Sequence, residues 1–227
     1  MNRRSILALG GASLAVAVAP TAALAGQKVS VRIEGATHTL QAARTVQTPT
    51  GFITKFGAPA ATCPAGSALG ALDVATHGRW KGKFYTSFND FLISSVLGET
   101  PNIKTGYWGI WVNHRYATTG ACEIRIRASD QILFAVDSVK KHEHPLGIIA
   151  PATATAGKPF TLKVVSYSDK GRATPLAGAR VRGGGLSLVS GKRGTVPVTA
   201  AAATKLTYTA TDRGYIRAAA TTVKITK

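Results

Sequence analysis

The stretch Tyr107-Trp108-Gly109-Ile110-Trp111-Val112-Asn113 decides the fold around it. It predicts a buried β-strand that ends in a tight turn at Asn113-His114-Arg115, with His114 in solvent. Because side chains alternate along a strand, Trp108 and Trp111 lie on opposite faces. At least one of them should lie in the core, and we favour burial of both under the helix and loops. The alternative is that the other lies at a helix edge or is exposed, where with Tyr116 it stacks on a sugar or a flat ligand. The ligand-contact candidates are Tyr107, Trp108, Trp111 and Tyr116.

The segments around this strand predict an α+β domain. One helix of about ten residues is expected within 65–77, because leucines and alanines recur at helical spacing up to Gly78, a residue suited to end a helix. Alternating apolar and polar residues predict further strands at 29–33, 37–40, 91–96, 123–127 and 131–136. Phe88 is assigned to an extended segment.

The chain has two cysteines, Cys63 and Cys122. An even pair in an exported chain is typical of a structural disulfide. A zinc site is the alternative, but neither cysteine has a Cys or His partner two to four residues away. We therefore predict a disulfide and no metal at the cysteines.

The segments 29–35, 107–113, 120–122 and 129–134, with Cys63-Pro64 before the helix, resemble a family of secreted bacterial domains. This family, domain of unknown function 4430, is similar to the C-terminal domain of transcobalamin. The resemblance covers about residues 27–137 and implies a β-grasp-like sheet packed on one helix. In transcobalamins this kind of domain closes over cobalamin held by a large helical barrel. Nothing here could build that barrel, so the resemblance implies a ligand- or surface-binding module.

The last third of the chain predicts a β-sandwich. Short alternating segments are separated by Gly- and Pro-containing turns at about ten-residue spacing, at 160–166, 179–182, 195–199, 205–210 and 219–226. The segments 175–181 and 210–217 resemble bacterial immunoglobulin-like modules of secreted and wall-associated proteins. The Cys-Trp-Cys signature of antibody-type domains is absent from the sequence.

A shift in composition near residue 145 divides the chain. We expect a signal peptide at 1–25, the α+β domain at 26–141, a linker and first strand at 142–157, and the core of an immunoglobulin-like sandwich at 158–227. The leader has a cationic Arg3-Arg4, an apolar run and the small-residue pattern Ala23-Leu24-Ala25. A membrane anchor is the alternative, but glycines interrupt the run and it is short for a span. The general secretory and twin-arginine routes both stay open.

Charge is strongly biased toward the basic side. The chain has 28 Lys and Arg against 10 Asp and Glu, a net charge of +18 and a pI near 10.4. Residues 145–227 hold 13 of the basic and only 2 of the acidic residues. The anionic-surface candidates are Arg180, Arg182, Lys192 and Arg193, of which the first two share a strand face. The alternative is that charge only maintains solubility. With no recognition helix or RNA-binding aromatic motif, we expect no sequence-specific nucleic-acid binding.

The sequence contains no familiar catalytic motif: no Gly-x-Ser-x-Gly, His-Glu-x-x-His, phosphate-binding loop or EF-hand pattern. His142-Glu143-His144 offers two metal ligands, but we assign it to an exposed linker because a third and fourth ligand are missing. We therefore predict a protein that is not an enzyme and uses no cofactor or metal.

Together these features predict a monomer that is secreted or associated with the cell envelope and has no transmembrane segment in its mature form. We expect it to bind anionic envelope polymer or a surface protein. One alternative is an extracellular small-molecule carrier module that needs a partner, with a deep apolar pocket beside Trp108 or Trp111. A hydrolase, with acids or histidines converging in a cleft, is the less favoured alternative.

Overall fold

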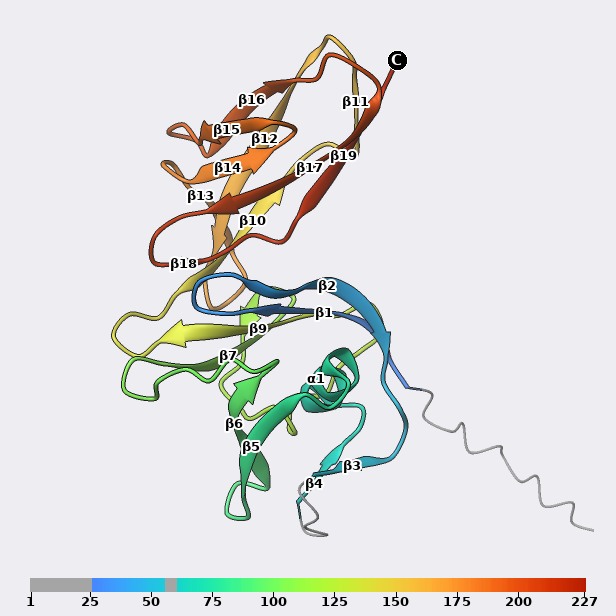
Figure 1. Ribbon diagram of the computed structural model, residues 1–227, viewed down its shortest axis with the longest axis vertical. Helices are drawn as coiled ribbons and strands as arrows, with labels where there is room; N and C mark the ends of the chain where they lie inside the picture. The colour runs from blue at the N-terminus through green and yellow to red at the C-terminus, as the bar shows by residue number, and fades with distance from the viewer. Residues whose placement is uncertain (1–25, 56–60) are drawn as a thin grey trace, which may run out of the picture.

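The computed structural model describes residues 26–55 and 61–227, so the predicted signal peptide at 1–25 lies outside the described residues. The described chain is mainly β and has a single helix, α1 (Ala68–Thr76). It forms an N-terminal half (26–141) and a C-terminal half (142–227), which lie end to end (Figure 1). Each half has its own hydrophobic cluster. None of the described helical structure is long and apolar enough to cross a membrane.

The N-terminal half is built on a five-stranded sheet with the order β2-β1-β9-β7-β8. Its strands are β1 (Lys28–Glu34), β2 (Thr39–Gln47), β7 (Gly106–Val112), β8 (Arg115–Tyr116) and β9 (Gln131–Ser138). The two central strands, β1 and β9, pair in parallel, whereas the other neighbours pair antiparallel. The sheet therefore joins the beginning and the end of this half.

Helix α1 covers one face of this central sheet (Figure 1). Alternate side chains of β1, β7 and β9 point toward this face, among them Val31, Trp108 and Phe134. They pack against the buried side of the helix, which includes Leu69 and Leu72. The Ser67 side chain accepts a hydrogen bond from the Gly70 amide at 3.3 Å and caps the start of the helix. His77, in the left-handed region at φ 52°, ends it. The helix predicted from the sequence is confirmed.

Two short ribbons complete the N-terminal half. They pair β3 (Phe52–Thr54) with β4 (Thr62–Pro64) and β5 (Trp80–Tyr85) with β6 (Asp90–Val96). The predicted disulfide is present: Cys63 of β4 is bonded to Cys122, with 5.2 Å between their Cα atoms. It ties the first ribbon to the segment that precedes β9.

The C-terminal half consists of two five-stranded sheets that enclose one hydrophobic cluster. The first sheet contains β10 (His144–Ile149), β12 (Pro159–Tyr167), β13 (Ala173–Pro175), β16 (Thr195–Thr199) and β18 (Tyr215–Ile216). The second has the order β11-β19-β17-β14-β15: β11 (Thr153–Thr155), β14 (Arg180–Gly183), β15 (Leu186–Val189), β17 (Thr204–Thr211) and β19 (Thr221–Thr226). Both sheets bury their alternate residues in this cluster, for example Leu162, Val164, Val181, Tyr208 and Val223.

Two local expectations are wrong. The segment 123–127 is not a strand, because the carbonyls of Ala121 and Ile124 accept hydrogen bonds from the amides of Leu69 and Ala68 at the start of α1. It satisfies the amides of the first helical turn, which have no partner within a helix. Phe88 lies in the turn between β5 and β6 and is 70% exposed.

The second face of the central sheet is covered by the C-terminal half. Trp111, Leu133 and Ala135 on this face form a third cluster with Ile216 of β18. Trp111 is therefore fully buried, and Trp108 on the opposite face is only 7% exposed. The favoured prediction that both tryptophans are buried is confirmed. Gly109 is needed here, because a Cβ at this position would lie 2.7 Å from Cη2 of the Trp111 ring.

Candidate functional site

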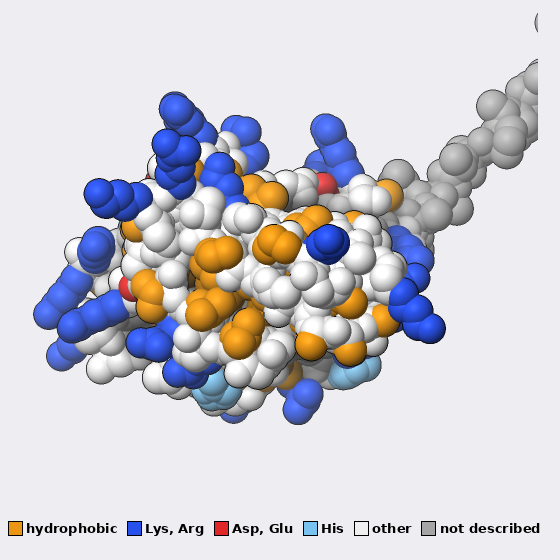
Figure 2. All heavy atoms as spheres, turned by 90° about the horizontal axis from the view of Figure 1, so that it is seen from above, with side chains coloured by type: hydrophobic (Ala, Val, Ile, Leu, Met, Phe, Trp, Pro, Cys, Tyr) orange, Lys and Arg blue, Asp and Glu red, His pale blue; other side chains and the backbone are white. Residues whose placement is uncertain are grey.

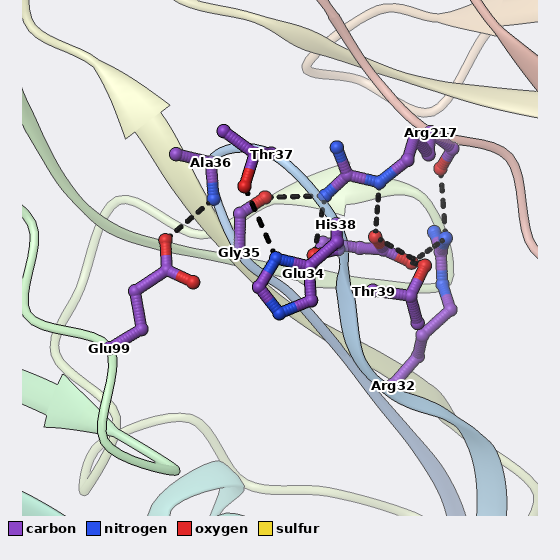
Figure 3. Close-up of polar contacts among 9 residues, drawn as sticks. All are labelled: Arg32, Glu34, Gly35, Ala36, Thr37, His38, Thr39, Glu99 and Arg217. Carbon is purple, nitrogen blue, oxygen red and sulfur yellow. Dashed lines mark hydrogen bonds and ion pairs between the residues drawn. The ribbon is translucent and has the colours of Figure 1, made fainter.

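The surface between the two halves is built around a buried carboxylate, Glu34 of β1. Its oxygens accept hydrogen bonds from Arg32 at 2.9 Å, from the Thr39 hydroxyl at 2.9 and 3.1 Å, and from Nε of Arg217 at 2.8 Å. Arg217 comes from the C-terminal half, and its guanidinium also donates to the carbonyls of Gly35 and His38 (Figure 3). We call Arg32, Glu34, Thr39 and Arg217 the Glu34 network. It satisfies a buried charge with groups from both halves.

A second buried carboxylate, Asp137 of β9, lies on the same covered face. Its Oδ2 accepts a hydrogen bond from the Tyr107 hydroxyl at 2.8 Å and lies 2.5 Å from Nδ1 of His142. Its Oδ1 accepts from the amides of Ser138 and Glu143, both at 2.8 Å. Burial raises the pKa of the Tyr107 phenol, and its hydrogen bonds to Tyr116 and Asp137 act in the same direction. Tyr107 is therefore a fixed donor to Asp137.

The other nitrogen of His142 faces the C-terminal half. Nε2 lies 2.9 Å from Oδ1 of Asp169, in the loop between β12 and β13, and Nδ1 of His144 lies 3.4 Å from the same oxygen. The His142 ring stacks on Trp111 at 5.9 Å between centroids and 12° between planes. The exposed-linker interpretation of this segment is therefore wrong, because His142, Glu143 and His144 are all partly buried.

An open groove lies between β6 and β7 in the N-terminal half, with a volume of about 440 Å³. Consecutive residues of both strands line it, 91–93 of β6 and 107–110 of β7, so the strand edges rather than their faces form its walls. Tyr116 and the loop 117–121 close one side. The Trp108 indole Nε1 is buried and has no hydrogen-bond partner among residues 26–55 and 61–227. The groove continues past the exposed Phe88 and Leu92 into a neighbouring hollow.

Asp90 is a buried acid that lines this neighbouring hollow. Its side chain accepts hydrogen bonds from the amides of Phe91 at 2.6 Å and Cys122 at 3.0 Å. Burial raises its pKa above the ordinary value of an aspartate, against the opposing effect of these hydrogen bonds. Glu123 lines the same hollow, and its charge also raises the pKa of Asp90.

The four ligand-contact candidates occupy two places. Tyr107, Trp108 and Tyr116 line the groove, whereas Trp111 is enclosed between the halves and has no surface for a ligand. The structure therefore removes Trp111 from this set. Sequence reasoning missed Asp137 and Asp169 as partners of His142. Asp137 approaches it through the turn that follows β9, and Asp169 approaches it through the fold of the loop between β12 and β13.

The anionic-surface candidates lie on the second sheet of the C-terminal half and beside it. Arg180 and Arg182 alternate with the buried Val181 on β14, so both point outward. The same outer face carries Lys205 of β17 and Lys224 of β19. The five strands of this sheet contain no acidic residue. Lys192 and Arg193 are exposed in the connection from β15 to β16, which crosses to the other sheet. Seen from above, Lys and Arg project around the molecule and acidic side chains are scarce (Figure 2).

Comparison with known proteins finds little similarity. No family model and no curated protein matches the chain. Among solved structures, a crystal structure from Ruminococcus gnavus described as "a putative metal binding protein" matches 49% of this chain and 97% of its own. The sequence identity is 15% and the TM-score 0.34. A TM-score this low carries no inference about fold or ligand.

Proposed function

We propose that this chain is a secreted, non-enzymatic binding protein that contacts anionic polymer of the cell envelope. In this proposal its N-terminal half is a β-grasp-like domain of the transcobalamin C-terminal type, and its C-terminal half is an immunoglobulin-like sandwich. The single observation that carries the proposal is the outer face of the sheet β11-β19-β17-β14-β15. It combines four outward cations, rows of threonine hydroxyls and no carboxylate.

The chemistry of this face suits a flexible polyanion. Arg180 and Arg182 lie two residues apart on one strand. Their cross-strand partners on β17 are Thr211 and Thr209, respectively. Guanidinium groups bind phosphate and carboxylate oxygens with paired hydrogen bonds, and neighbouring hydroxyls add weaker ones. A flat face of this kind binds repeating charges rather than one enclosed molecule, and such contacts weaken as salt screens them.

The test uses purified protein that begins at Gly26, with long-chain inorganic polyphosphate and isolated cell envelope as probes. Affinity is measured over a salt series from about 0.01 to 1 M. We expect salt-sensitive binding to both probes. The variant Arg180→Glu/Arg182→Glu should lower the affinity at least about tenfold at low salt. It should also reduce the slope of log affinity against log salt concentration by the amount expected for the loss of about one to two ionic contacts.

The matched control is Lys81→Glu/Lys83→Glu. These lysines are also exposed, lie two apart on one strand, β5, and change the net charge by the same amount. The proposal requires near-normal binding by this control. Equal weakening of both variants would show that total charge rather than this face matters, and absence of binding at low salt would overturn the proposal.

The groove beside Trp108 favours a second candidate function, carriage of a small apolar molecule. Its walls are mainly apolar, and the unpartnered Trp108 Nε1 could donate a hydrogen bond to a ligand oxygen. The groove is open rather than deep, so a carrier would need a partner or a movement of the β5–β6 ribbon to enclose its ligand.

A further inference from the structure

Three potential metal ligands meet where the two halves join. His142, His144 and Asp169 each offer one ligand atom, and these atoms all lie within 4.8 Å of one another. His142 lies in the connection between β9 and β10, His144 is the first residue of β10, and Asp169 comes from the loop between β12 and β13. The fold therefore supplies the third ligand that the sequence alone did not reveal.

We propose that these three side chains bind a divalent transition-metal ion of the Zn²⁺ class. Two imidazole nitrogens and one carboxylate oxygen form a donor set that suits Zn²⁺, Co²⁺ or Ni²⁺, whereas Mg²⁺ and Ca²⁺ prefer oxygen ligands alone. Ligands at about 2.0–2.1 Å from a tetrahedral ion lie roughly 3.3–3.4 Å apart. The observed separations from Asp169 Oδ1, 2.9 Å to His142 and 3.4 Å to His144, are close to this spacing.

The surroundings hold the first ligand in place. Asp137 binds Nδ1 of His142, so Nε2 points toward Asp169. Histidines that bind metals commonly carry such a carboxylate on the other nitrogen, where it fixes the ring and increases its basicity. Asp137 is itself fully buried and held by Tyr107 and two backbone amides. The stacked Trp111 ring limits rotation of the imidazole further.

The other two ligands have room to adjust. Nδ1 of His144 is buried and lies 3.4 Å from Asp169 Oδ1, but it makes no hydrogen bond within the part of the chain that the structure describes, so an ion would satisfy it. The Asp169 side chain is 56% exposed and can move to accommodate an inserted ion. The fourth position of a tetrahedral site would remain for water or for a group from a partner. All three ligands belong to the C-terminal half, and His142 connects the ion site to Asp137 of the N-terminal half.

The test measures Zn²⁺ binding to untagged, chelator-treated protein by isothermal titration calorimetry, with Co²⁺ as a spectroscopic probe. We expect one Zn²⁺ per chain, no comparable binding of Mg²⁺, and a visible Co²⁺ spectrum of four-coordinate type. Asp169→Ala and His144→Ala should each weaken Zn²⁺ binding by at least roughly tenfold, because loss of a residue that only orients a ligand already costs about ten- to a hundredfold. The exposed His38 provides the matched control, His38→Ala, which should bind Zn²⁺ like the wild type.

A readout of stability separates metal binding from a simple ion-pair cluster. If the site binds metal, Zn²⁺ raises the melting temperature of the wild type but not that of Asp169→Ala. If His142 only bridges two aspartates, Asp169→Ala lowers the melting temperature equally with and without chelator and Zn²⁺ has no effect, which would overturn the proposal. Saturable binding that both ligand variants retain would also overturn it.

Discussion

His114 shows how a single side chain can join the two halves. It lies in the two-residue turn between β7 and β8, where Asn113 and His114 have φ values of 50° and 67°. Its ring stacks on Tyr167 of β12 with 3.8 Å between centroids and 4° between planes. The expectation that His114 is solvated is therefore wrong, because the sequence does not reveal a partner in the other half. Gly147 makes room for this Tyr167 ring, since a Cβ there would lie 2.6 Å from it.

This stack should make stability depend on pH. Burial lowers the pKa of His114 below its ordinary value of 6.5, and the charge of Arg32 acts in the same direction. The unfolded chain then takes up a proton before the folded chain does, so stability is full above about pH 6.5 and falls as the pH drops through the folded-state pKa. We expect the free energy of unfolding in urea to fall with decreasing pH in the wild type. The fall should be smaller in His114→Phe, because phenylalanine keeps the stack on Tyr167 but cannot take up a proton.

The matched control for this prediction is His38→Phe, at an exposed histidine of the same half. All other titrating groups remain in each variant, so only the difference between the variants and the wild type reports on His114. An unchanged pH dependence in His114→Phe would contradict the prediction. A single group contributes at most about 1.4 kcal/mol per pH unit.

At the scale of elements, the open edges of β6 and β7 distinguish the N-terminal half. β7 pairs with β9 along its whole length, but on its other side only Trp111 and Val112 pair with β8. The Ala117 amide donates to the Ile110 carbonyl, and beyond this bond the edge borders the groove. Backbone groups along an unpaired strand edge are free to bind another molecule. The groove therefore combines apolar side chains with strand edges.

If the groove binds apolar ligands, its exposed apolar rim should matter. Titration with the fluorescent anion 8-anilinonaphthalene-1-sulfonate should give an increase in fluorescence as the probe binds. The variant Phe88→Ser/Leu92→Ser should reduce this increase several-fold. The control Ile103→Ser/Val189→Ser removes two equally exposed apolar side chains elsewhere and should leave the signal nearly unchanged. Equal reduction by the two variants would argue against a specific site in the groove.

The sequence predicts the longer elements well and the junction poorly. The strands β1, β6, β7, β9 and β12 and the helix were predictable because alternation or helical spacing extends over several residues. Strands of two or three residues, such as β8, β11 and β18, are too short to carry such a period. The cluster at His142 was not predictable, because its members come from β9, the connection to β10, the first residue of β10 and a distant loop. The burial of Trp111 likewise depends on the other half.

At the scale of the whole molecule, the Glu34 network holds the halves together. Arg217 reaches from the C-terminal half to one carboxylate oxygen and two backbone carbonyls of the loop between β1 and β2 (Figure 3). Arg32 donates in the opposite direction, to the carbonyl of Arg217 at 2.8 Å. With the apolar cluster around Trp111, these bonds make the two halves a single packed unit at their junction.

Removing this arginine should uncouple the halves. We expect Arg217→Ala to lower the free energy of unfolding by about 1–3 kcal/mol, because Glu34 loses a charged partner that it cannot replace with water. Calorimetry should then show a broadened or divided transition, and limited proteolysis should cut faster near residue 142. The exposed Arg213 gives the control, Arg213→Ala. Identical melting of the two variants would contradict the prediction.

The parallel pairing of β1 with β9 sets the order in which this protein can form. Ser30 pairs with Gln131, so the two central strands are joined by about a hundred intervening residues. Contacts of such long range carry a large loop-closure cost and slow folding. Until β9 has been synthesised, β1 has only its hairpin partner β2, and the surface that receives the C-terminal half does not exist. The central sheet is therefore completed late, and a growing chain remains without its core for most of its synthesis.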